Sequence, residues 1–125
     1  MSEPQALAYP DIEIYLKRVP VEDILSWLDG LIGICESTQR GEKTEVILTD
    51  NVPCTIFENA VKGGYTSVWF RENRSPWLTD EACAEVAFAH FGVEVRCSTG
   101  SWEGEDEQGW IRFTKDGRSV VNWLA

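Results

Sequence analysis

Residues 79–97 contain the clearest hydrophobic pattern in the chain. The first part of this segment has four apolar residues at spacings of three and four: Ala84, Ala87, Phe88 and Phe91. This spacing predicts a helix with one buried face over residues 79–91. We expect Thr79 to cap the N-terminus of this helix, and Gly92 to end it in the left-handed conformation. Alternating apolar residues then predict a strand over residues 93–97.

The same order of elements is predicted earlier in the chain. Residues 11–19 alternate between apolar and polar side chains, which predicts a strand with one solvent-exposed face. Residues 20–32 repeat apolar residues at helical spacing, with Pro20 suited to the first helical position and Gly33 to the end. The helix stripe is expected to consist of Val21, Leu25, Leu28 and Ile32.

Short runs rich in β-branched and aromatic residues predict the remaining strands. These runs are residues 34–39, 44–49, 52–60, 65–72, 110–114 and 119–124. Pro53 favours an edge position or a late start for its strand. Aromatic residues fall on both faces of residues 65–72, so we expect this strand to be central or covered on both sides. A second covering surface in so small a chain indicates a partner or a homodimer.

These elements predict an α+β fold in which a mainly antiparallel sheet carries two helices packed on one face. Residues 1–125 are expected to form a single domain, with residues 1–10 as a flexible arm. One strand, one helix and three strands follow each other in residues 11–60 and again in residues 65–125, so the chain reads as two βαβββ halves. A duplication would produce this order of elements. Residue identity between the halves is low, however, so chance explains the order equally well.

Composition narrows the class of partner. The chain has 21 Asp and Glu against 11 Lys and Arg, which gives a net charge of −10. A negative field of this size disfavours direct binding to nucleic acid and to anionic membrane surfaces, and it favours a basic protein partner. No apolar run reaches the ~20 residues that span a bilayer, and the N-terminus lacks the features of a signal peptide. These features predict a soluble cytoplasmic protein in which the four cysteines are reduced thiols.

His90 is the only histidine and therefore the first candidate for acid–base chemistry. Its predicted place in the last helical turn is also typical of a structural histidine. Cys83, His90 and Cys97 are spaced by seven residues, but seven helical residues rise about 10.5 Å, too far for the first two to share a zinc ion. The sequence contains no nucleotide-binding or nucleophile motif, so we predict no metal and no cofactor. A small-molecule-binding or enzymatic domain with a cleft near His90 remains the alternative function.

The most distinctive surface feature is the acidic segment between residues 102 and 110. Its candidate partner-binding residues are Trp102, Glu103, Glu105, Asp106, Glu107 and Trp110. Clustered carboxylates flanked by tryptophans suit the capture of an Arg- or Lys-rich partner. The alternative is a solvated hairpin loop whose tryptophans fold back into the core.

The leading hypothesis from the sequence is a non-catalytic protein-binding or inhibitor module that recognises a basic partner. In composition alone, the chain resembles small acidic inhibitors of nucleic-acid-handling proteins, such as toxin-immunity proteins. A structural homodimer module without an independent ligand is a further alternative.

Overall fold

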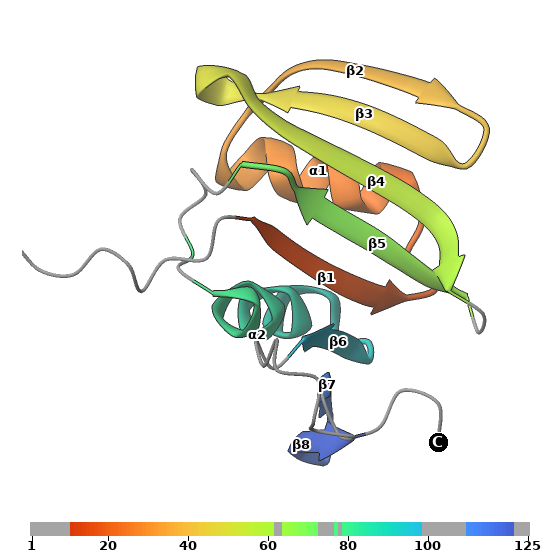
Figure 1. Ribbon diagram of the computed structural model, residues 1–125, viewed down its shortest axis with the longest axis vertical. Coiled ribbons are helices and arrows are strands. Elements are labelled where there is room, and N and C mark those ends of the chain that lie inside the picture. Colours follow the sequence, from red (N-terminus) through yellow and green to blue (C-terminus); the bar gives the residue numbers. More distant parts are fainter. Residues whose placement is uncertain (1–10, 62–63, 73–76, 78, 99–109, 122–125) are drawn as a thin grey trace, which may run out of the picture.

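The computed structural model describes residues 11–61, 64–72, 77, 79–98 and 110–121 (Figure 1). The elements follow one another as β1 (Ile12–Lys17), α1 (Val21–Leu31), β2 (Ile34–Arg40), β3 (Lys43–Leu48), the 3-10 turn η2 (Thr49–Asn51), β4 (Val52–Val61), β5 (Tyr65–Phe70), α2 (Asp80–Phe91), β6 (Val95–Ser98), β7 (Trp110–Thr114) and β8 (Gly117–Val121). Each predicted helix and strand is therefore present, with shifts of a few residues at the ends.

All eight strands belong to one sheet, in the order β2-β3-β4-β5-β1-β6-β7-β8. Every pair of neighbouring strands is antiparallel. In Figure 1, β2 and β8 lie at opposite ends of the sheet, and β1 lies between β5 and β6. The predicted α+β fold with a mainly antiparallel sheet is confirmed.

Both helices cover the same face of this sheet. Ile12, Ile14 and Leu16 alternate along β1 with half-buried polar and aromatic residues, and all three are fully buried on the helix side. The ring of Phe88 in α2 stacks on Phe113 of β7, 6.3 Å between centroids, which places α2 over that end of the sheet. The ring of Trp27 in α1 meets Phe91 of α2 at 5.2 Å, so the two helices lie side by side. One hydrophobic core joins the sheet and both helices.

The element order βαβββ occurs twice, as predicted, but the two halves place their strands differently. Each helix connects two strands that run in the same direction. The connection through α1 passes over three strands, because β5, β4 and β3 lie between β1 and β2. The connection through α2 passes over β1 alone, which lies between β5 and β6. The halves therefore share the order of their elements along the chain but not the order of their strands in the sheet.

Several local expectations need correction. Pro20 caps α1 in an extended conformation, with φ −66° and ψ 152°, and does not occupy the first helical position. The stripe of α1 also differs, because Ile24 and Trp27 are buried whereas Leu25 is only partly buried. The edge position inferred from Pro53 is wrong, since β4 lies between β3 and β5. Pro53 pairs with Ile47 of β3, but the register with β5 begins only at Cys54. Proline is tolerated there because it lies at the start of the strand, before the pairing with β5.

The capping signals in the second half are confirmed. The Thr79 hydroxyl accepts a hydrogen bond from the Ala82 amide at 3.1 Å. Gly92 ends α2 with φ 69°. Thr114 pairs with Gly117 across the predicted hairpin turn, so β8 begins two residues earlier than expected. Residues 122–124, which were assigned to the last strand, lie outside the described residues.

Candidate functional site

The two helices differ from the rest of the described chain in the sign of their charged side chains. Each helix contains three acidic residues and no Lys or Arg. These residues are Glu22, Asp23 and Asp29 in α1, and Asp80, Glu81 and Glu85 in α2. The cations of the described residues lie in the strands and loops. Asp80 is buried, and Arg118 of β8 forms an ion pair with Glu81 at 2.6 Å. The exposed acidic surface of the helical layer therefore consists of Glu22, Asp23, Asp29 and Glu85.

A shallow groove of about 430 Å³ lies between α1 and α2. Its lining is mostly apolar and consists of Ser26, Trp27, Gly30, Leu31, Val86, Ala89 and His90. Leu31 and Val86 are 45% and 37% exposed, on opposite walls. Only four large hydrophobic side chains of the described residues are this exposed, and the groove contains two of them. The groove is therefore where apolar surface gathers on the helical layer.

Helical spacing explains how this lining arises. Trp27, Gly30 and Leu31 are three and four residues apart and share one face of α1. Val86, Ala89 and His90 have the same spacing on α2. These two faces border the same groove, whereas Leu28 and Ala84 belong to the core, as does Trp27 at the base of the groove.

Gly30 is an unusual residue for the middle of this groove wall. A Cβ atom added at Gly30 would meet no other atom within 4 Å, so packing inside the fold does not require glycine there. Glycine inside a helix costs about 1 kcal/mol of stability relative to alanine. The open space above Gly30 leaves room for another molecule to approach the helix backbone closely.

An aromatic cluster forms the floor of the groove. Trp27 is only 5% exposed, and its ring stacks on Trp77 at 6.0 Å with an interplanar angle of 21°. Trp77 in turn meets Phe70 of the sheet edge-on at 5.6 Å. The floor is therefore tied to the core through successive ring contacts.

His90 is one of the residues that line the groove. The imidazole is exposed, and its centroid lies 6.1 Å from Trp27 and 4.7 Å from Phe91. Among the described residues that line the groove, His90 alone has a titratable side chain. Acid–base or nucleophilic catalysis would also need a second group within hydrogen-bonding reach of the imidazole. The described lining contains one side-chain hydroxyl, that of Ser26 on the other helix.

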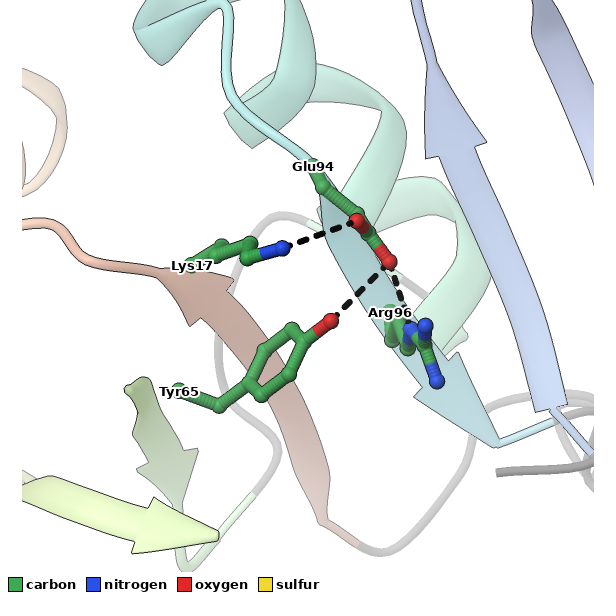
Figure 2. Close-up of polar contacts among 4 residues, drawn as sticks. All are labelled: Lys17, Tyr65, Glu94 and Arg96. Atoms are coloured by element: carbon green, nitrogen blue, oxygen red, sulfur yellow. Dashed lines mark hydrogen bonds and ion pairs between the residues drawn. The ribbon is translucent and has the colours of Figure 1, made fainter. Parts of the chain in front are cut away.

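The opposite face of the sheet carries a polar network centred on Glu94 (Figure 2). Its Oε2 accepts hydrogen bonds from the Tyr65 hydroxyl at 3.0 Å and from Nε of Arg96 at 2.7 Å. Its Oε1 lies 3.8 Å from Nζ of Lys17. Burial opposes ionisation of Glu94, but the hydrogen bonds from Arg96 and Tyr65 outweigh burial and hold the pKa of this carboxyl below its ordinary value. Lys17, Tyr65 and Arg96 all contact Glu94, and they come from the three strands β1, β5 and β6.

Of the partner-binding residues predicted in the acidic segment, the structure describes only Trp110. It begins β7 and is half-buried on the face away from the helices. Its ring meets Tyr15 edge-on at 5.7 Å. Five predicted residues lie outside the described residues: Trp102, Glu103, Glu105, Asp106 and Glu107. Their role stays a prediction.

Cys83, His90 and Cys97, which are spaced by seven residues, differ in how far they are buried. Both cysteines are buried, and burial raises the pKa of Cys97 to about 12 and that of Cys83 well above its ordinary value. His90 is exposed in the groove. No group of three His, Cys, Asp or Glu side chains in the described part of the chain is arranged to hold a metal ion.

Comparison of the chain with protein-family models, with curated proteins and with solved structures gives no match. No helix in the described ranges is long and apolar enough to cross a membrane. A proposal about function must therefore rest on the residues themselves.

Proposed function

We propose that this protein is a non-catalytic binding or inhibitor module that captures a basic protein partner on its helical layer. The observation that supports this proposal is the apolar groove between two helices that contain four exposed acidic residues and no Lys or Arg. Burial of Leu31 and Val86 would supply affinity, because apolar surface gains about 25 cal/mol for each Å² removed from water. The surrounding carboxylates would select a cationic partner.

Charge also determines how the partner would arrive. A net charge of −10 attracts a basic protein over distances comparable to the Debye length of about 10 Å at 0.1 M salt. Association is therefore fast at low salt and slows as salt is added, whereas the apolar contacts are insensitive to salt.

Charge reversal on the helical layer tests the proposal. Asp23 and Glu85 are exposed, one on each helix, so the double variant Asp23→Lys/Glu85→Lys removes acidic surface from both. The control Glu36→Lys/Asp116→Lys makes the same change of net charge at exposed positions in β2 and in the β7–β8 turn. Pull-downs from native lysate at low and at about 0.5 M salt would identify salt-released basic proteins.

The rate of association is then measured with a purified partner from these pull-downs. We expect the helix variant to slow its association about tenfold and the control to change it little. Equal effects of both variants would show that net charge alone matters and would contradict a site on the helices.

The acidic segment offers a second location for the same function. Charge reversal at Glu103, Glu105, Asp106 and Glu107 would slow association if the partner binds there. A loss confined to this variant would move the site from the helical layer to the segment. A loss in both variants would indicate a partner that contacts both surfaces.

A small-molecule-binding or enzymatic domain remains a second candidate function. It is favoured by one observation, the exposed imidazole of His90 beside a groove whose volume lies in the range of ligand sites. An activity or a small ligand that is lost in His90→Ala, with the fold intact, would support this candidate. Retention of that activity would remove His90 from the site.

A homodimer module is the third candidate. β2 and β8 end the sheet and have no further strand beside them within the described residues. A strand edge can pair with a second copy. Light scattering would show a dimer that persists at high salt if this candidate is correct, and a monomer would remove it.

A further inference from the structure

We infer that the occupant of the groove is a basic amphipathic α-helix of the partner, with apolar residues at spacings of three and four and Lys or Arg beside them. This inference rests on the proposed function and specifies the partner at the same site. It follows from the backbone chemistry of the groove walls, from the space above Gly30 and from the position of Asp23.

Backbone hydrogen bonding separates a helical occupant from an extended one. A peptide that binds as a strand needs unpaired N–H and C=O groups on its receptor. The lining residues of both walls lie beyond the first turn of their helices, so their amide N–H groups are already paired with carbonyls one turn earlier. A bound helix satisfies its own backbone and requires only side-chain contacts. The apolar lining therefore fits a helix and not a strand.

The shape of the groove supports the same occupant. On α1 the lining extends from Ser26 to Leu31, about 7.5 Å along the helix axis. Packed helices have axes 8–10 Å apart, at a distance that depends on the side chains at the contact. Gly30 and Ala89 provide such residues on the two walls. A third helix can therefore sit between Leu31 and Val86, with one or two of its turns buried.

Charge specifies the flanks of the bound helix. Asp23 precedes Ser26 by three residues and Trp27 by four, so it continues the lined face of α1 beyond the groove. Glu85 adjoins Val86 on the other wall. The last turn of α1 contains no basic residue, which leaves the negative end of its dipole without a cation from the helix itself. Lys and Arg beside an apolar stripe complement these features.

The test uses a synthetic probe and does not depend on knowing the partner. A fluorescein-labelled 18-residue peptide of Leu and Lys is made with Leu at spacings of three and four. A second peptide has the same composition in an order that breaks the stripe. Fluorescence anisotropy at low salt gives the affinity of each, and circular dichroism reports the helicity gained on binding. We expect the striped peptide to bind at least tenfold more tightly and to gain helix.

Substitution in the groove locates the binding. Gly30→Phe adds a ring at a position where a Cβ atom meets no other atom within 4 Å, and we expect it to weaken the striped peptide at least tenfold. The control Thr38→Phe adds the same ring at an exposed position of β2 and should leave the affinity unchanged. Thermal melting of both variants confirms that each is folded, and Ala89→Phe repeats the test on the other wall.

The outcomes distinguish this inference from the proposed function. Equal binding of both peptides, unchanged by Gly30→Phe and Ala89→Phe, would overturn the helix inference while leaving a basic partner in place. Binding of neither peptide would also overturn it. In that case, sensitivity of the purified partner to Asp23→Lys/Glu85→Lys would preserve the proposed function, and insensitivity would remove both.

Discussion

The Tyr65 hydroxyl donates a hydrogen bond to Oε2 of Glu94 over 3.0 Å, joining β5 to the residue just before β6. These two strands are not neighbours, because β1 lies between them. The Glu94 backbone also holds this position, since its carbonyl accepts from the Lys17 amide at 3.1 Å. The network of Figure 2 therefore fixes the end of the connection through α2, one of the two helices that form the groove.

Removal of either side chain of this pair should lower the stability of the fold. We expect Tyr65→Phe to reduce the free energy of unfolding at pH 7 by about 1 kcal/mol, and Glu94→Gln by about 1–2 kcal/mol, because the latter also weakens the bond to Arg96. Urea unfolding followed by circular dichroism measures both changes. Glu36→Gln, at an exposed position, serves as the control.

The effect of Glu94→Gln should also depend on pH. The folded pKa of Glu94 lies below its ordinary value, so its contribution is complete above about pH 4.5 and is lost as the pH falls through the folded pKa. The difference between Glu94→Gln and the unmodified protein should therefore shrink below about pH 4. A difference that stays constant down to pH 3 would show that ionisation of Glu94 does not matter.

The elements of this fold could be predicted from sequence because their signals are local. Thr79 and Gly92 bound α2 through contacts within one turn, and the alternation of residues 65–72 follows from which face of β5 is covered. β5 lies between β4 and β1, so its expected central position is confirmed. Such patterns depend on near neighbours in the chain.

The order of strands and the groove depend on distant residues, and the sequence does not reveal them. Nothing in the two βαβββ halves distinguishes a connection that passes three strands from one that passes a single strand. Leu31 and Val86 are far apart in sequence and form one surface only when α1 lies beside α2. Gly30 was the available signal, because glycine inside a helix calls for an explanation.

Asp80 should make stability decrease as the pH rises. Burial is the main cause that raises the pKa of this carboxyl from 3.8 to about 7. The hydrogen bond from the Glu13 amide lowers the pKa, and the negative charge of Asp11 raises it further. A raised folded pKa means that the folded state binds the extra proton, so stability falls from about pH 4 to about pH 7 and is then constant.

Asp80→Asn keeps the acceptor for the Glu13 amide and removes the charge. Its stability relative to the unmodified protein should grow across this window by about 1–2 kcal/mol, after allowance for solvent screening. Urea unfolding at pH 4 to 8 measures the difference, with the exposed Asp116→Asn as control. Parallel pH curves for the Asp80 variant and the unmodified protein would contradict burial of a charge at this position.

Gly30 and Gly33 should respond oppositely to alanine. We expect Gly30→Ala to raise the free energy of unfolding by about 0.5–1 kcal/mol, because the added methyl group meets no atom within 4 Å and alanine favours the helix. Gly33 has φ +107°, and a Cβ there would lie 2.5 Å from Oγ1 of Thr49. Gly33→Ala should therefore lower stability by about 1–3 kcal/mol. Thermal and urea melts compare the two, and equal effects would contradict this geometry.

The four cysteines should divide into one reactive and three protected thiols. Cys35 is exposed in β2, whereas Cys54, Cys83 and Cys97 are buried. The thiolate is the reactive form, and burial raises the pKa of both Cys54 and Cys97 to about 12. At pH 8 their ionised fraction is then on the order of 10⁻⁴, before access is considered. Titration of the native protein with a chromogenic disulfide should therefore give one fast thiol.

Unfolding in urea should expose the other three thiols, and Cys35→Ser should remove the fast one. The slow reaction of the native protein is expected to follow the free energy of opening, since the buried thiols react only when the core opens. Gly33→Ala should then accelerate the slow phase while leaving the fast thiol unchanged. Two or more fast thiols in the folded protein would contradict the buried positions of these cysteines in the core beneath the helices.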